Sequence, residues 1–264
     1  MPLVRGPDCG AEASMVILVN MFMQKVKARG RGRPPGRTAE GAAAKRRLYA
    51  AAIGLMAKRG YESTTLRDVA DEAGVSVGLL YRYFPSKRAV IVELYEELSA
   101  EYARQVAEMP RGRWRDRFLF AVTTSLEVLE PHRSALKGLI PVIVGDPEEG
   151  VFAEGMAFSR RRVQAAFESA VAGATDAPGA PLAEALGRLL YLAHLGVLLW
   201  WLLDKSPRQR ATGALVGLSR QILPSAALTL KLPPVRRFVL AADALFREAL
   251  FGDPDSGTGG TVNG

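Results

Sequence analysis

The chain has 264 residues, 48% of them hydrophobic, which allows one large domain or two small ones around a sizeable core. Cys9 is the single cysteine, which excludes a disulfide framework and a thiolate metal cluster and makes a reducing cytoplasm the simplest location. The net charge of +8 lies in one segment, because residues 24–47 hold nine basic residues and one acid and the remaining charges sum to zero. Such a segment is typical of polyanion binding rather than of a generally basic protein.

Residues 1–38 are predicted to form a disordered basic extension. The apolar stretch from Ser14 to Met23 has about ten residues, whereas roughly 18–20 are needed to span a membrane. Basic residues follow this stretch instead of preceding it, and it lacks a small-residue cleavage site, so a signal peptide is not indicated either. We expect no membrane association.

Within the extension, residues 29–37 read Arg-Gly-Arg-Gly-Arg-Pro-Pro-Gly-Arg, which is similar to an AT-hook core. Glycine and proline keep such a strip thin and extended, and its arginines fit a narrow A·T minor groove. Arg31 and Arg33 are therefore predicted to contact DNA. The alternative is a solvated linker that touches phosphates only.

Residues 39–85 are predicted to form a three-helix domain. The first helix carries apolar residues at helical spacing and ends at Gly60. The second is predicted to start at the N-cap Thr65, with Asp68 completing a capping box, and to stop at Gly74. Ser76 can cap a third helix that turns Leu80 and Phe84 inward and ends at Pro85. Two short helices around a glycine turn predict a helix-turn-helix, the alternative being an ordinary helical hairpin.

Residues 45–98 resemble the DNA-binding domain of the TetR family of bacterial repressors. The resemblance rests on the residues at 59–65, 68–70, 73–76 and 80–87. It implies phosphate contacts by Tyr81 and Lys87 and a contact of Arg67 with a guanine edge. Where the family often has polar side chains, positions 77–79 are apolar or bare, which leaves more of the specificity to methyl contacts and DNA shape. The predicted DNA-binding residues are Thr65, Arg67, Ser76, Val77, Gly78, Leu79, Tyr81, Arg82, Tyr83 and Lys87.

Residues 86–251 are predicted to form a larger helical domain for effector binding and dimerisation. It begins with a long connecting helix at 86–108, in which Val90, Leu94, Leu98 and Tyr102 form one row. Proline, glycine and aspartate joints divide the rest, and residues 252–264 read as a flexible tail. The predicted helices are 113–130, 132–144, 148–172, 181–204, 207–223 and 234–251.

Residues 182–203 are the most apolar segment, and from Leu189 onward a helix here is apolar almost all round. Such a helix must be covered on every side, so one face is expected to meet a second subunit. The alternative is a core helix within one subunit. A membrane-spanning helix is disfavoured, because charged residues on both sides leave an apolar span that is too short. One of the two helices after this segment is expected to join it in the homodimer interface, in which the predicted residues are Leu195, Leu198, Leu199, Trp200 and Leu202.

The same region offers residues for a mostly apolar effector pocket, with Tyr191 and His194 as its polar groups. Pro141 is expected to open space by kinking its helix. Phe158 and Phe167 are also offered to this pocket, and the competing interpretation is that all these aromatics only fill the core. The predicted ligand-binding residues are Trp114, Phe118, Phe152, Met156, Tyr191 and His194.

No catalytic constellation, metal-ligand spacing or phosphate loop is visible, so we expect neither an enzyme nor a cofactor or metal. The sequence predicts an all-α, homodimeric, cytoplasmic transcriptional regulator. It would bind double-stranded operator DNA as a repressor and be released by a small hydrophobic effector. The alternative is an architectural DNA-binding protein without an effector response.

Overall fold

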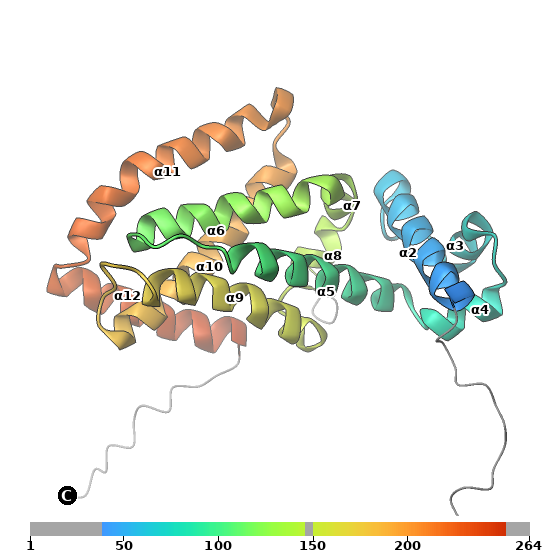
Figure 1. The fold of residues 1–264 in the computed structure, drawn as a ribbon, viewed down its shortest axis with the longest axis horizontal. Helices are drawn as coiled ribbons and strands as arrows, with labels where there is room; N and C mark the ends of the chain where they lie inside the picture. The colour runs from blue at the N-terminus through green and yellow to red at the C-terminus, as the bar shows by residue number, and fades with distance from the viewer. Residues whose placement is uncertain (1–38, 146–149, 252–264) are drawn as a thin grey trace, which may run out of the picture. The chain divides into compact units, whose positions relative to one another are not determined.

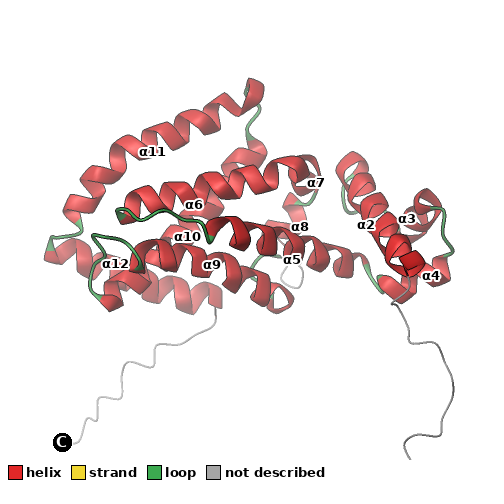
Figure 2. Cartoon of the chain, in the orientation of Figure 1, coloured by secondary structure: helices red, strands yellow, loops and turns green. Residues whose placement is uncertain are grey.

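The computed structural model describes residues 39–145 and 150–251, and every regular element within these ranges is a helix (Figures 1 and 2). By its contacts the chain forms two compact units, residues 1–43 and 44–264, and the described part of the first is the opening of α2. The all-α prediction is confirmed. The predictions for 1–38, which include Arg31 and Arg33, and for 252–264 lie outside the described residues, and the predicted domain boundary at residue 85 stays a prediction.

The helix-turn-helix region consists of α2 (Ala39–Arg59), α3 (Leu66–Ala73) and α4 (Val77–Tyr83). The predicted apolar positions of all three helices meet in one small core, and Leu80 and Phe84 are fully buried as predicted. Four buried residues of α2 and two of α3 complete this core: Leu48, Ala52, Leu55, Met56, Val69 and Ala70.

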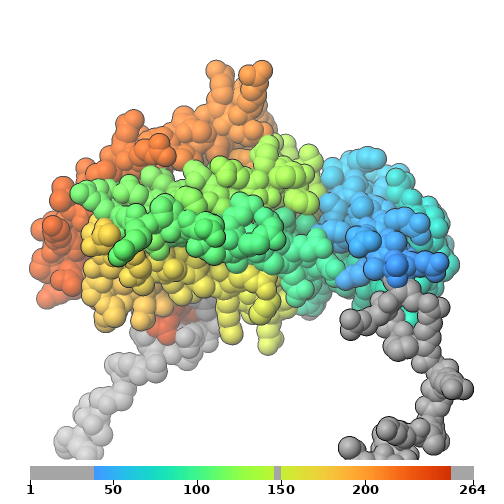
Figure 3. All heavy atoms as spheres, in the orientation of Figure 1, coloured from blue at the N-terminus to red at the C-terminus, as the bar shows by residue number. Residues whose placement is uncertain are grey.

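The long helix α5 (Lys87–Val106) continues from this region into the larger helical domain. There it packs between α6 (Trp114–Leu129) and α9 (Ala157–Ala172), and α10 (Ala180–Leu203) lies against α9 (Figure 1). In the space-filling view the α5, α6 and α9 spheres touch on the visible face (Figure 3). The predicted row from Val90 to Tyr102 is buried.

Between α6 and α9 the chain departs from the predicted helices. It forms η1 (Glu130–His132), α7 (Arg133–Gly138), α8 (Ile140–Gly145) and η2 (Glu154–Met156). The break at Leu139 falls two residues before Pro141, as expected for a proline in the first turn of a helix. The predicted start of the next helix at 148 is wrong: α9 begins at 157, because the Arg160 Nη1 group donates to the Val151 and Ala153 carbonyls and holds these residues in a turn.

The last helices are α11 (Arg210–Thr229), entered through η3 (Pro207–Gln209), and α12 (Pro233–Phe246), which runs into the π-helical η4 (Arg247–Phe251). The predicted end of α11 at residue 223 is wrong, since the helix continues through Pro224. An interior proline costs a helix about 3 kcal/mol. Apolar residues on both sides of it, Leu223 and Ala227, pack against the core and keep the helix continuous.

By length and composition alone, α10 is a helix that could cross a membrane, a test that core helices of soluble proteins also pass. Its first half is tied to α12, because the Arg188 guanidinium donates to both carboxylate oxygens of Asp243 at 2.7 Å. Leu182 and Ala185 pack there with Val239 of α12. The first half of α10 is thus covered within the chain, whereas Trp200 and Leu203 near its end are about half exposed.

Candidate nucleic-acid interface and ligand cavity

The turn between α3 and α4 is built as the sequence predicts. The Thr65 hydroxyl oxygen accepts from the Asp68 amide at 3.1 Å, and the Asp68 carboxylate accepts from the Thr65 amide at 3.0 Å. These bonds hold the pKa of Asp68 below its usual value. Gly74 ends α3 in the left-handed region at φ 63°, which glycine adopts without strain, and the Ser76 hydroxyl caps α4. The fixed turn sets the direction in which α4 presents its outer face.

The predicted DNA-binding residues divide into two groups by exposure. Val77, Leu79, Tyr83 and Lys87 are half-buried, and Val77 and Tyr83 pack against the core. Val77 and Tyr83 lie three residues before and after Leu80, so they share the side of α4 that faces the core. The exposed group consists of Thr65, Arg67, Ser76, Gly78, Tyr81 and Arg82.

Lys87 connects α5 to the helix-turn-helix region. Its ammonium donates to the Tyr61 carbonyl at 2.9 Å and lies 4.1 Å from the centre of the Tyr61 ring. Lys45 of α2 forms an ion pair with Glu93 of α5. These contacts couple the start of α5 to the domain that carries α4, and an ammonium with three donors keeps capacity for the predicted phosphate contact.

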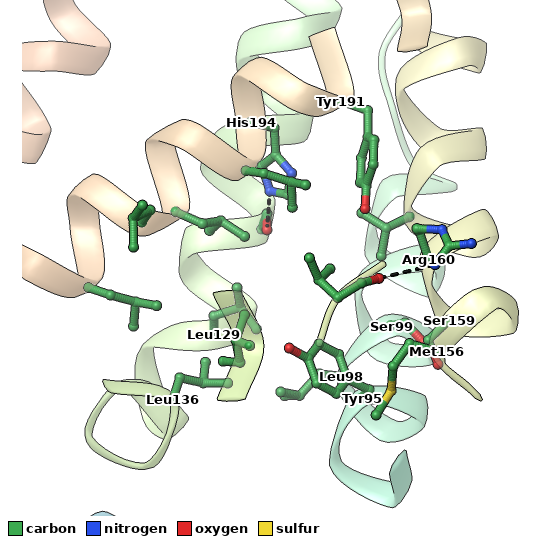
Figure 4. A pocket seen from close by; sticks show the side chains of 18 of the residues that line it. Tyr95, Leu98, Ser99, Leu129, Leu136, Met156, Ser159, Arg160, Tyr191 and His194 are labelled. Carbon is green, nitrogen blue, oxygen red and sulfur yellow. Dashed lines mark hydrogen bonds between the residues drawn. The ribbon is translucent and has the colours of Figure 1, made fainter. Parts of the chain in front are cut away.

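A cavity of about 330 Å³ lies in the larger domain, and residues of α5, α6, α7, α8, η2, α9 and α10 line it (Figure 4). Its walls are mostly aliphatic, with Leu129 and Leu136 on one side of the view and Arg160 on the other. Four residues of α5 line it: Tyr95, Leu98, Ser99 and Tyr102. The helix that leads from the helix-turn-helix region therefore forms part of the cavity wall.

His194 is the most deeply buried polar group of this wall. Its Nε2 atom shares a hydrogen bond of 2.8 Å with the Ser125 hydroxyl (dashed in Figure 4), and burial lowers the pKa of His194 to about 3. The imidazole is therefore neutral at physiological pH. The near-parallel ring of Tyr102 lies 6.4 Å away, centre to centre, and burial raises the pKa of Tyr102.

Of the six predicted ligand-binding residues, four line the cavity: Phe152, Met156, Tyr191 and His194. Trp114 and Phe118 do not. Trp114 starts α6, where its amide donates to Asp176, and Phe118 packs in the core at 6.0 Å from Phe167. Phe158, expected to point inward, is 64% exposed beneath the Arg162 guanidinium.

Four of the five residues predicted for the dimer interface, Leu195, Leu198, Leu199 and Leu202, also line the cavity. Leu195, Leu198 and Leu199 are also partly exposed, so their place in the cavity wall leaves the subunit contact a prediction. Trp200, the fifth, is 50% exposed.

The sequence did not indicate that residues of α5 line the cavity. The spacing of Leu98 and Tyr102 showed only that they belong to a buried row. The described residues contain no cluster of three potential metal ligands.

Residues 48–94 match the family model described as bacterial regulatory proteins, tetR family. The transcriptional repressor KstR of Mycobacterium tuberculosis is 42% identical over 68 residues, which cover 26% of this chain and 30% of that protein. The repressor KstR2 of Rhodococcus jostii is 35% identical over 108 residues, covering 39% of this chain and 52% of that one. The chain thus spans about a third to a half of the length of these relatives.

Solved structures extend the likeness beyond the first domain. A tetR-family regulator from Streptomyces coelicolor has a TM-score of 0.51 at 20% identity, covering 80% of this chain and 94% of that one. A TetR regulator from Nitrosomonas europaea has a TM-score of 0.51 at 17% identity, covering 69% and 97%. These likenesses establish a shared fold. The helix-turn-helix region, residues 48–94, thus matches the tetR family of bacterial regulatory proteins in sequence, and the larger helical part of the chain shares the fold of solved tetR-family regulators.

Proposed function

We propose that this protein is a cytoplasmic transcriptional repressor that binds operator DNA through α4 and is released by a small, mostly apolar effector. The observation that carries DNA binding is the capped α3–Gly74–α4 turn, which leaves Arg67, Tyr81 and Arg82 exposed. A recognition helix of this kind enters the major groove while neighbouring groups hold the phosphates. The similarity to the KstR repressors supports repression.

The cavity supports the effector part of the proposal. It is lined mainly by apolar side chains, as small-molecule sites are, and Tyr191 and His194 are among its polar groups. Because α5 both lines the cavity and begins directly after α4, a ligand that prefers one position of α5 shifts the orientation of α4. This gives the effector a physical route to the DNA.

The protein is proposed to act as a homodimer, since reading two half-sites needs two recognition helices. With most predicted interface residues at the cavity, the exposed apolar residues of α11 and α12 are the better candidates for the contact. They include Leu218 and Ile222 on α11, spaced four apart, and Phe238 and Leu245 on α12, spaced seven apart. Each pair lies on one face of its helix.

The basic extension is proposed to add affinity through Arg31 and Arg33 in the minor groove. The competing function, an architectural protein that bends or coats DNA without an effector, would rely on this extension. Only the repressor requires both an operator preference and a ligand response, which separates the two functions.

The test is selection of bound sequences from random DNA by purified protein, followed by binding measurements on the selected site and a scrambled one. Arg67→Ala is expected to cost roughly 1–3 kcal/mol on the selected site and to relax specificity. Tyr81→Ala should weaken binding to both sequences. Arg104→Ala, which removes the same charge from an exposed position on α5, is the matched control and should leave the preference unchanged. Equal affinity for selected and scrambled DNA at physiological salt would contradict the proposal.

A further inference from the structure

Two buried polar atoms at the cavity lack hydrogen-bond partners among the described residues: the Tyr102 hydroxyl and the His194 Nδ1 atom. The two side chains belong to different helices, α5 and α10, and both line the cavity. Their residues are 3% and 1% exposed, so bulk solvent does not reach the two atoms, and a ligand in the cavity meets them when the side chains around them shift. A buried polar atom without a partner costs about 1–3 kcal/mol. A ligand that pairs with both atoms recovers this free energy on binding.

The chemistry of the two atoms narrows the group that can satisfy them. Because Nε2 of His194 is bonded to the Ser125 hydroxyl, Nδ1 is either a donor or an acceptor according to the tautomer. The Tyr102 hydroxyl can do both. A ligand hydroxyl both donates and accepts, so it can pair with these two atoms in either tautomer, whereas a carbonyl oxygen requires donors only.

The surroundings disfavour a charged group at this position. Burial keeps His194 neutral, and Arg160, the one charged side chain among the lining residues described, lies on another side of the cavity in Figure 4. Arg160 already donates to the carbonyls of Val151 and Ala153. An ionised group beside Tyr102 and His194 would lose its hydration without gaining an ion pair.

We propose that the ligand class of this cavity is a neutral, mostly apolar small molecule with a hydroxyl group that Tyr102 and His194 bind together. The inference rests on the proposed function, since it defines the effector of that regulator. The volume of about 330 Å³ lies at the lower end of ligand pockets, which span roughly 300–1,000 Å³, so the molecule is compact.

Three probes with one ring body test the proposal: 9-phenanthrol, phenanthrene and phenanthrene-9-carboxylate, each titrated by fluorescence into the full chain. Wild type is expected to bind the phenanthrol roughly tenfold more tightly than phenanthrene, as one recovered hydrogen bond predicts. Tyr102→Phe should abolish this preference, keep the affinity for phenanthrene and leave the protein at least as stable. Tyr49→Phe, which removes a buried hydroxyl of α2 outside the cavity, is the matched control and should retain the preference.

Equal affinity of wild type for phenanthrol and phenanthrene would overturn the ligand class while leaving the cavity a binding site. Tighter binding of the carboxylate that is lost in Arg160→Met would also overturn it, by placing the polar group at Arg160. Binding of none of the three probes would overturn it as well. Release of operator DNA is measured separately, so a phenanthrol that binds with the expected preference but releases no DNA supports the ligand class and contradicts the effector role.

Discussion

Adding a single methyl group at Gly138 tests the contact between the ligand-binding region and the helix-turn-helix region. Gly138 is the last residue of α7, and a Cβ atom there would lie 2.6 Å from the Met56 carbonyl oxygen and 3.7 Å from the Gly60 Cα atom. The Met56 oxygen cannot easily withdraw, because it accepts the Gly60 amide at 2.9 Å where α2 ends. The contact is backbone against backbone.

Two opposing terms set the size of the effect of Gly138→Ala. Replacing a helical glycine by alanine usually stabilises a protein by roughly 0.5–1 kcal/mol. Overpacking a tight contact costs typically 1–3 kcal/mol. Since neither backbone can yield without moving its helix, we expect the second term to win and the variant to lose about 1–2 kcal/mol of unfolding free energy.

The matched control is Gly155→Ala. Its Cβ atom would also meet another atom at 2.6 Å, but that atom is Nη2 of Arg88, the end of a long side chain that can rotate away. We expect a change within about 0.5 kcal/mol. Urea denaturation of both variants gives the comparison. A Gly138→Ala protein as stable as wild type, or a Gly155→Ala protein that is the less stable of the two, would refute the steric reasoning.

The same variant has a functional readout. Leu136 and Ile140, on either side of Gly138, line the cavity, so α7 lies between the cavity and α2. Displacing α7 from α2 should weaken the response of operator binding to a bound probe more than it weakens probe binding. Anisotropy titrations with labelled operator, with and without 9-phenanthrol, measure both.

Two further predictions concern His194 and the subunit contact. The pKa of His194 is about 3 in the folded chain and 6.5 when exposed, so between these pH values His194 binds a proton only in the unfolded chain. The contribution of His194 to the free energy of unfolding is therefore fully present above pH 6.5 and falls by about 2 kcal/mol from pH 7 to pH 5. Thermal or urea unfolding of His194→Gln should lack this loss, and a variant with the same difference between pH 7 and pH 5 as wild type would contradict the prediction. Phe238 is 72% exposed on α12, and Phe238→Glu should yield a folded monomer in sedimentation while wild type sediments as a dimer. The control Leu232→Glu introduces the same charge at an exposed position in the loop before α12 and should remain dimeric. A dimeric Phe238→Glu would remove this face from the interface.

Local interactions explain why the helix-turn-helix could be predicted in detail. The capping box of Thr65 and Asp68, the left-handed Gly74 and the cap at Ser76 each involve residues within a few positions of one another. Such features are written in short sequence patterns and do not depend on what packs against them. The same reasoning placed Leu80 and Phe84 in the core.

The larger domain was less predictable because its features depend on distant partners. Leu198 and Leu199 have the composition of a subunit contact and also of a cavity wall, and only the positions of α5, α6 and α8 decide between them. In the same way, Arg160 stops α9 from starting earlier through carbonyl groups seven and nine residues away. Pro224 stays within α11 because the residues around it are packed on the core.

The placement of Tyr102 connects these observations. Tyr102, on α5, carries one of the two polar atoms without a partner, and His194, on α10, carries the other. A ligand hydroxyl that binds both atoms would therefore link α5 to α10. A ligand without such a group fills the same apolar volume but lacks this link. Binding changes the DNA affinity only as far as the ligand distinguishes the two positions of α5. The polar pair therefore gives this cavity a means of making ligand chemistry, as well as occupancy, matter for DNA binding.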